Sequence, residues 1–476
     1  MFFGIERWLV GGLIGAIIGA FIAIIAIALI FFISEYRRQK TYKGKILSRL
    51  DTADMLLQEN MPNDALAIYT DILKDVSQEK DPETYSLIKN SEGRCHYNLS
   101  FRKNKSENIL KAIECYEESI RFINPQKFPE NYALTNYNLG NTYMKLSEFY
   151  ETEKSLNKAV NAFRESLKIY MLDKHPANYA VMQSNLCSAY ITLAGFKDTG
   201  ENLIKAVSAC EDALKIYTVD RYPVNYAAVQ TNLGSAYMGL AEFHNKEDCL
   251  SNAISAYKSS LGVYTVDKYP AEFAKAHKNI GNACKSLSEL QRKEDNLINA
   301  VAAYNEALRV YSMGNLPYDY AETMKYLGDA YKAFAQVGNE YENLLKSIQS
   351  YSDALRVYTI NEHPLEFSSI QQSVGDAYAM LFKAKGEEEN LVNEINAYLE
   401  ALKIKTIKDY PNDYASIQHN LGSAYKSLAK LRDAADNLSK AEQAYTEALK
   451  VYTFEDFPLD HRAVALELEK MRQTVS

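Results

Sequence analysis

The stretch YTVDRYPVNYAAVQTNLGSAYMGLAEF (residues 217–243) returns 47 residues later, at residues 264–290, as YTVDKYPAEFAKAHKNIGNACKSLSEL. Prolines mark the same period along most of the chain. Nine of the eleven prolines are spaced by 47 residues each time: Pro82, Pro129, Pro176, Pro223, Pro270, Pro317, Pro364, Pro411 and Pro458. A fixed period without insertions indicates a repeat protein, in which each unit is one supersecondary element that stacks on its neighbours.

Each unit reads as a helical hairpin. A proline at the first turn starts a helix well, because its missing N–H would be unpaired there anyway. After Pro223, apolar residues recur at steps of three and four, which is the helix period: Tyr226, Val229, Leu233, Ala236, Tyr237 and Leu240. The polar residues 244–248 interrupt this stripe, and a second one follows: Leu250, Ala253, Ile254, Tyr257, Leu261 and Tyr264. One hairpin cannot bury both stripes alone, so we expect neighbouring hairpins to stack into a solenoid.

The repeat resembles the tetratricopeptide repeat (TPR), whose signature is Leu-Gly-x-x-Tyr in the first helix and Ala-x-x-x-aromatic-x-x-Ala in the second. The Leu-Gly pair and its variants stand at Leu139-Gly140, Leu233-Gly234, Ile280-Gly281, Leu327-Gly328, Val374-Gly375 and Leu421-Gly422. The resemblance implies an all-α fold, an α-solenoid forming a right-handed superhelix of about nine hairpins over residues 46–457, with a capping helix over 458–476. The period of 47 exceeds the family's usual period of about 34. The thirteen extra residues can lengthen both helices of each hairpin by about one turn.

A separate apolar segment precedes the repeats. Residues 9–33 contain no charged residue and are long enough to cross a bilayer as a helix. Five basic residues lie in 34–45, whereas 1–8 has only Arg7 beside Glu6. The positive-inside rule therefore predicts a single-pass cell-membrane protein with a non-cytoplasmic N-terminus, a basic juxtamembrane linker and a cytoplasmic repeat array. Small residues at four-residue spacing on the span predict self-association or docking onto another membrane helix: Gly11, Gly15, Gly19 and Ala23. A cleaved signal peptide is the alternative.

The resemblance also implies a binding surface, because the first helices of TPR hairpins line a concave groove. The asparagine directly before the Leu-Gly pair or its equivalent matches a family position that hydrogen-bonds an extended peptide: Asn138, Asn185, Asn232, Asn279 and Asn420. An amide can both donate to and accept from a peptide backbone. The alternative is that these amides bond the neighbouring hairpin. Five lysines on the same helices form a possible basic groove for an acidic partner, or simply a solvated face: Lys275, Lys278, Lys285, Lys325 and Lys332.

Other function classes find little support in the sequence. The formal charge of −8 lacks the basic footprint of a nucleic-acid-binding protein. Neither the seven histidines nor the six cysteines have metal-ligand spacing, and nucleotide-binding and hydrolase motifs are missing. We therefore expect no enzyme activity, no cofactor and no metal.

The sequence thus predicts a membrane-anchored scaffold that binds a protein or extended peptide segment in its concave groove and recruits or assembles it at the membrane. One alternative is a structural subunit of a membrane complex, docked through the glycine-rich span. A second is an externally facing, chaperone-like TPR protein. Fold alone does not choose among such roles.

Overall fold

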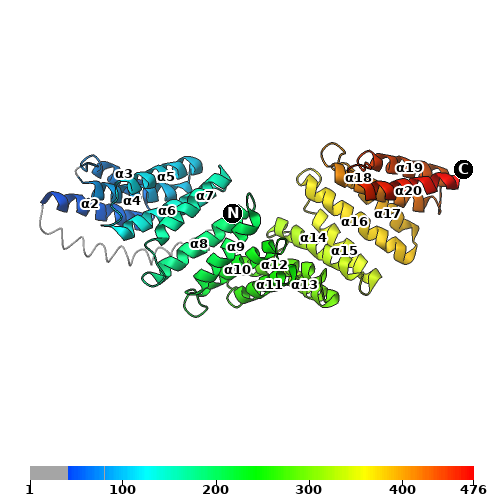
Figure 1. The fold of residues 1–476 in the computed structure, drawn as a ribbon, viewed down its shortest axis with the longest axis horizontal. Coiled ribbons are helices and arrows are strands. Elements are labelled where there is room, and N and C mark those ends of the chain that lie inside the picture. Colours follow the sequence, from blue (N-terminus) through cyan, green and yellow to red (C-terminus); the bar gives the residue numbers. More distant parts are fainter. Residues whose placement is uncertain (1–40, 80, 476) are drawn as a thin grey trace. The chain divides into compact units, whose positions relative to one another are not determined.

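The computed structural model describes residues 41–79 and 81–475, and this part of the chain is all-α (Figure 1). Apart from one isolated bridge between Ser312 and Asn315, it contains no extended pairing. The predicted all-α class is therefore confirmed for the described residues. Helix α2 (Thr41–Gln58) begins five residues before the predicted start of the repeats at residue 46.

The chain divides into two units, Met1–Thr199 and Gly200–Ser476. The first unit contains α2, α3 (Pro62–Ile72), α4 (Pro82–Ser100), α5 (Lys105–Phe122), α6 (Pro129–Leu146), α7 (Thr152–Leu167) and α8 (Pro176–Ala194). The second contains α9 (Thr199–Leu214), α10 (Pro223–Leu240), α11 (Lys246–Leu261), α12 (Pro270–Ser288), α13 (Lys293–Leu308), α14 (Pro317–Phe334), α15 (Glu340–Leu355), α16 (Pro364–Lys385), α17 (Glu388–Leu402), α18 (Pro411–Leu428), α19 (Ala434–Leu449) and α20 (Pro458–Val475).

Every proline of the 47-residue series begins a helix: α4, α6, α8, α10, α12, α14, α16, α18 and α20. The residue before the proline lies outside the right-handed α-helical region, as at Tyr269 with φ −138° and ψ 60°. This geometry follows from the clash of the proline ring with an α-helical residue in front of it. The spacing of the prolines in the sequence therefore sets where the first helix of each repeat begins.

Within each unit, helices that follow one another in the chain pack together as antiparallel hairpins and stacked neighbours. The first helices of successive hairpins also contact one another: α2 with α4, α4 with α6 and α6 with α8 in the first unit, and α12 with α14 and α14 with α16 in the second. Within each unit, we call the surface formed by the even-numbered helices the first-helix face. It is the surface that corresponds to the predicted groove.

Aromatic side chains form the centre of each hairpin. Seven tyrosines are at most 2% exposed: Tyr69, Tyr116, Tyr257, Tyr304, Tyr351, Tyr398 and Tyr445. The Tyr304 ring lies against Gly281 of α12, where an added Cβ would sit 2.5 Å from the ring. The same contact recurs between Gly328 and Tyr351, 47 residues on. The signature glycine is therefore required by the close approach of the second-helix ring.

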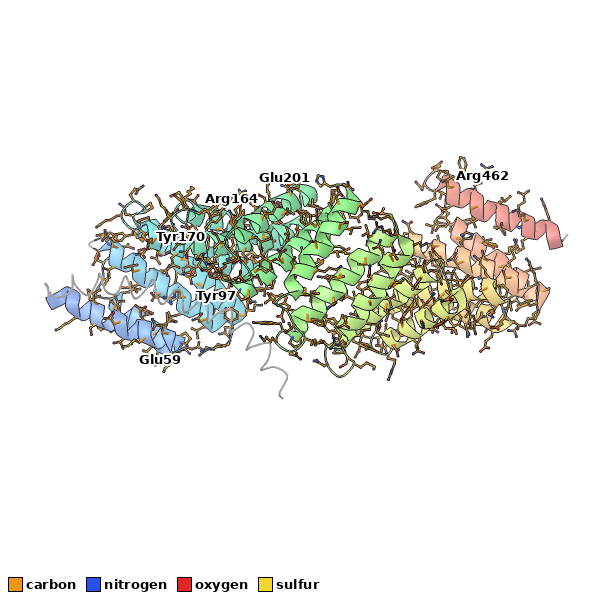
Figure 2. The ribbon with its side chains drawn as sticks, turned by 90° about the horizontal axis from the view of Figure 1, so that it is seen from below. Glu59, Tyr97, Arg164, Tyr170, Glu201 and Arg462 are labelled. Carbon is orange, nitrogen blue, oxygen red and sulfur yellow. The ribbon has the colours of Figure 1, made fainter. Side chains whose placement is uncertain are left out.

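Tyrosines near the loops add polar contacts to this packing. Tyr170, which follows α7, is 5% exposed, and its hydroxyl donates to the Glu130 carbonyl on α6 at 3.3 Å (Figure 2). This bond fastens the end of the hairpin to the start of its first helix. The burial confirms that these tyrosines are mainly core residues.

A second 47-residue series marks the turns inside the hairpins. One position in this turn, 47 residues apart from repeat to repeat, is left-handed in seven of eight repeats: Asn104, Glu151, Asp198, Arg292, Asn339, Gly386 and Asp433. The exception is Asn245 (φ −53°), whose side chain instead accepts from the Asp248 N–H at 3.4 Å. Six of the seven are not glycine, so the turn keeps a conformation that L-residues rarely adopt.

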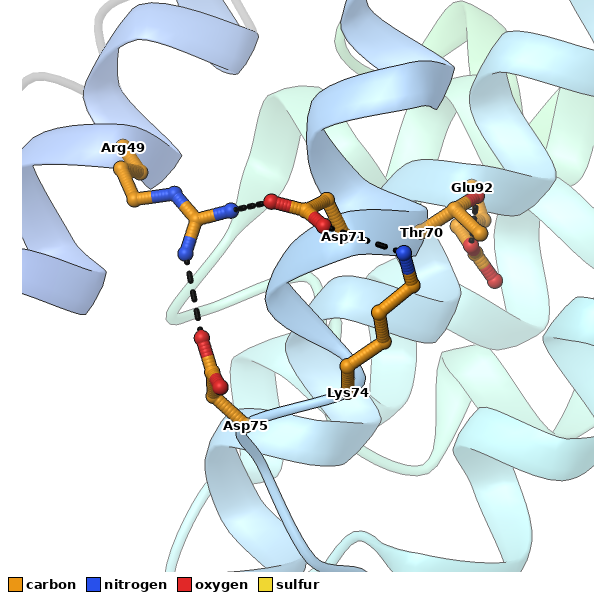
Figure 3. A network of polar contacts seen from close by, with 6 residues as sticks. All are labelled: Arg49, Thr70, Asp71, Lys74, Asp75 and Glu92. Atoms are coloured by element: carbon orange, nitrogen blue, oxygen red, sulfur yellow. Dashed lines mark hydrogen bonds and ion pairs between the residues drawn. The ribbon is translucent and has the colours of Figure 1, made fainter.

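Polar contacts also tie the first hairpin together (Figure 3). The Arg49 guanidinium on α2 forms ion pairs with Asp71 on α3 and, at 3.2 Å, with Asp75. On α3, the Thr70 hydroxyl donates to the Glu92 carboxylate of α4 at 3.0 Å. The Arg49 pairs are exposed to solvent, so they orient the helices more than they stabilise them.

The predicted location in the cell membrane needs correction. None of the helices formed by residues 41–79 and 81–475 is both long and apolar enough to cross a bilayer. These helices bury one apolar stripe against neighbours and carry charged residues elsewhere, which is the pattern of a packed solenoid. The predicted span at 9–33, with Gly11, Gly15, Gly19 and Ala23, lies outside the described residues.

Candidate protein-binding face

The predicted asparagine column lies on the first-helix face, and all five side chains are half-buried: Asn138, Asn185, Asn232, Asn279 and Asn420. Two of them bond the neighbouring hairpin. The Asn185 amide donates to Asn141 Oδ1 at 3.0 Å, and the Asn138 amide lies 3.5 Å from Asn90 Oδ1. These amides therefore connect stacked repeats in the structure, and their role in binding a peptide stays a prediction.

A second polar column lies three residues further along the same helices. Here the side chains accept hydrogen bonds from the buried tyrosines of the second helices. Three such bonds join Tyr304 to Asn282 at 2.7 Å, Tyr351 to Asp329 at 2.6 Å and Tyr398 to Asp376 at 2.9 Å. Burial and the neighbouring Asp376 carboxylate raise the pKa of Tyr398 well above its ordinary value, so the hydroxyl keeps its proton and donates. The aromatic core thus holds the carboxylates of the first-helix face in place.

Three of the five predicted lysines lie beside carboxylates. Lys278 is the most buried, and its Nζ lies 2.6 Å from Glu322 and 3.5 Å from Asp319. Lys332 lies 3.4 Å from Asp376, and Lys285 lies 3.7 Å from Glu289. Lys275 is exposed and Lys325 lies 5.8 Å from the Tyr326 ring centroid. The basic groove stays a prediction, but much of its charge is already matched within the chain.

A hollow of about 920 Å³ opens in the second unit, between the first helices α12, α14, α16 and α18 and the second helix α17. It brings together three of the predicted site residues, Lys285, Lys332 and Asn420. Its other charged lining residues are Glu289, Lys293, Asp329, Asp376, Lys383 and Glu394. Among its apolar lining residues are Met380, Phe382, Leu391 and Ala424. A concave site with mixed apolar and polar walls is typical of ligand-binding pockets.

Glu394 was missed by the sequence analysis, although a signal was present. Seven equivalent positions in other repeats carry a small residue that is fully buried: Ala112, Ala159, Ala206, Ala253, Ala300, Ser347 and Ala441. Glu394 is itself only 5% exposed. A carboxyl group where the repeat places a buried methyl group is a break in the pattern, and such breaks concentrate at functional sites.

The residues that the structure describes hold no group of three or more His, Cys, Asp or Glu side chains arranged to bind a metal ion. His277 on α12 has a buried Nδ1 with no partner, and its ring centroid lies 4.4 Å from that of Phe273, with the ring planes tilted by 60°. Burial lowers its pKa, so this imidazole stays neutral. It is a single, half-buried ring in the helix packing.

The fold was compared with known proteins. No family model matches the chain, and no curated protein matches it. Solved structures do match. The C-terminal part of a TPR repeat-containing protein from Cytophaga hutchinsonii has 15% identity and a TM-score of 0.41, covering 65% of this chain and 95% of that chain. The apo form of RapI has 14% identity and a TM-score of 0.43, covering 85% and 97%.

The repeat is TPR-like. This description rests on the stacked hairpins and on the glycine–aromatic contact within them. The 47-residue period is a property of this chain. At such low identity the solved structures bear on the fold alone, so function must come from the surfaces of the TPR-like array.

Proposed function

We propose that this chain is a non-catalytic scaffold that binds a segment of another protein along its first-helix face. The observation that supports the proposal most is the pair of polar columns on that face. They place an amide, hydroxyl or carboxylate side chain at a fixed step in one repeat after another, and an extended peptide presents its own groups at regular steps.

The hollow in the second unit supports the same proposal. Beside the polar columns it offers an apolar surface that includes Met380 and Phe382. A side chain of the partner that packs on this surface would lose its contact with water. Interfaces gain most of their affinity from a few such anchors, while polar contacts set register. The predicted asparagine ladder and basic groove would then supply the positioning contacts.

Site-specific photo-crosslinking tests the proposal on the full chain in its native host. A benzophenone amino acid replaces Ser423, an exposed residue on α18, or Thr446, an exposed residue on α19 of the same hairpin. We expect protein adducts from position 423 and not from position 446. Equal adducts from both positions, or none from position 423, would refute binding on the first-helix face.

A second experiment tests the asparagine ladder. Alanine replaces Asn138, Asn185, Asn232 and Asn279 together, and recovery of the crosslinked partner is measured. We expect a loss of about 10-fold or more, since several hydrogen bonds of about 1 kcal/mol each disappear. Circular dichroism and the melting temperature serve as the folding control. Unchanged recovery by the folded variant would exclude the ladder while leaving the first-helix face as a binding surface.

A further inference from the structure

Two residues of one hairpin depart from the repeat at places that are small elsewhere. Glu394 on α17 replaces an alanine or serine. Phe382 on α16 stands where the other repeats have buried small residues: Ser100, Ser147, Ala194, Ala241, Ser288, Ala335 and Ala429. Both large side chains line the same hollow. Large side chains thus replace small ones at two positions that meet in one hollow. Stacking of the repeats does not require either of them, so we expect them to serve a function at this site.

The Glu394 carboxyl is not paired with another side chain. No hydrogen bond or ion pair to it is formed by the residues that the structure describes, although it is 95% buried. Three lysines of the hollow contact other groups: Lys332 lies beside Asp376, Lys285 beside Glu289, and Lys293 donates to Gln336 at 2.9 Å. The fourth, Lys383 on α16, is close enough for its charge to act on Glu394 but forms no ion pair with it. Neither carboxyl oxygen is completely enclosed, so the group can be reached from the hollow. A carboxylate with so little water around it is costly unless a ligand or a proton neutralises it.

Two further carboxylates face the same space. Asp329 and Asp376 each accept a hydrogen bond from a buried tyrosine, which holds them against the wall of the hollow. We propose that the hollow receives one basic side chain, a guanidinium or ammonium group of the bound protein segment, with Glu394 as its counter-ion and Phe382 and Met380 contacting its aliphatic stem. This inference rests on the proposed function and names the chemistry of the segment that the hollow selects.

The protonation of Glu394 makes the site sensitive to pH. Burial, together with the nearby Asp376 and against the effect of Lys383, raises the pKa of Glu394 to about 8. The other charged groups that face the hollow are Lys285 and Glu289 on α12, Lys293 on α13, and Asp329 and Lys332 on α14. Below pH 8 the carboxyl must lose its proton before it can pair with a cation. Affinity for the cation should therefore fall as the pH falls.

The test is a methyl NMR titration of the full chain labelled at methionine methyl groups. The probe is the acetylated and amidated peptide Gly-Ser-Arg-Ser-Gly, and its control carries citrulline, which has a similar shape and no charge. Met380 lines the hollow and reports on binding there, whereas Met471 on α20 does not line it. We expect the Met380 signal to shift with the arginine peptide at low millimolar concentration, and at least about 10-fold more weakly with citrulline.

Variants of two glutamates test whether binding depends on the Glu394 carboxyl group or only on the net charge of the protein. Glu394→Gln and Glu394→Ala should each weaken the arginine peptide about 10-fold or more. Alanine is the residue of most other repeats, so the second variant should keep the fold. Glu342→Gln removes an exposed charge on α15 and should leave binding unchanged. Wild-type affinity should rise toward pH 8 from pH 6, while Glu394→Gln shows no such rise.

Three results would overturn the inference: equal binding of arginine and citrulline, equal binding by Glu394→Gln, or no Met380 shift up to about 10 mM peptide. Crosslinks from position 423 together with any of them would leave the scaffold proposal standing. Selective arginine binding without such crosslinks would refute the scaffold proposal and keep the cation site, because the hollow would then bind small basic molecules.

Discussion

At the scale of single residues, the glycine of the Leu-Gly pair is the position where the repeat tolerates least change. A Cβ at Gly281 would lie 2.5 Å from the buried Tyr304 ring. The ring is fixed by its hydroxyl bond to Asn282, so it has little room to move. The steric cost therefore exceeds the gain in helix propensity that alanine normally brings.

We predict that Gly281→Ala lowers the free energy of unfolding by about 1–3 kcal/mol, the usual cost of overpacking a core. The midpoint of urea unfolding measures this change. Gly338→Ala is the matched control, because an added Cβ there meets nothing within 4 Å. A larger loss at Gly338 than at Gly281 would contradict the steric explanation.

Glu394 leads to a prediction about stability and pH. Because its pKa is raised to about 8 in the folded chain, the folded state holds a proton that the unfolded state releases above the ordinary value of 4.5. The contribution of Glu394 to the free energy of unfolding should therefore be greatest below about pH 4.5 and decline toward pH 8. One pKa unit corresponds to about 1.4 kcal/mol, so the decline is on the order of 4 kcal/mol.

Glu394→Ala removes this group, so its stability relative to wild type should increase from pH 5 to pH 8. Urea unfolding of both proteins at several pH values isolates the contribution of residue 394 from all other titrations. Glu342→Ala is the control for an exposed carboxylate. A stability difference that stays constant with pH would mean that Glu394 is ionised in the folded protein.

At the scale of elements, the left-handed residue in most of the hairpin turns has a conformational cost that recurs along the chain. Arg292 has φ 42° and is exposed, whereas Gly386 occupies the equivalent position 94 residues later with φ 73°. A residue with a Cβ in this region costs about 1–2 kcal/mol more than glycine. Glycine in turn loses more backbone freedom on folding, by about 0.5–1 kcal/mol.

We predict that Arg292→Gly raises the free energy of unfolding by about 0.5–1 kcal/mol. Gly386→Ala should lower it by a similar amount, because it places a Cβ into the same conformation. Thermal and urea unfolding of the two variants measure both effects. Opposite signs from those stated would show that the turn relaxes when its residue is changed.

At the scale of the whole molecule, regular stacking makes each complete repeat exchangeable. Removing residues 270–316 joins Tyr269 to Pro317 and deletes α12 and α13 as one hairpin. The chain then continues with another proline-initiated first helix, so α14 meets the kind of surface that α12 met before. We predict a folded variant whose helical content per residue equals that of wild type.

Circular dichroism and size-exclusion chromatography of this deletion test the prediction. Removing residues 293–316 alone is the control, since α12 then loses the second helix that covers its apolar stripe. This control should aggregate or lose helicity. If both deletions behave alike, the hairpin is not the unit of folding.

Local sequence information determined much of this protein: the period, the helix starts and the glycine–aromatic core follow from proline chemistry, helix periodicity and close packing within one hairpin. The asparagine column was also placed on the first-helix face from sequence alone. Its contacts were decided by tertiary structure, because Asn138 and Asn185 reach polar groups that lie 44–48 residues earlier in the chain.

The set of side chains that line the hollow likewise depends on how the repeats stack. It combines side chains from α12 to α18, more than 100 residues apart, and no local pattern states which of them meet. Glu394 could be seen in the sequence as an exception to the alanine of other repeats. Its burial and its raised pKa depend on the neighbouring repeats that exclude water from it. Short-range rules thus fix the hairpin, while the site arises from long-range packing, where desolvation gives one carboxyl group properties that its sequence neighbours do not encode.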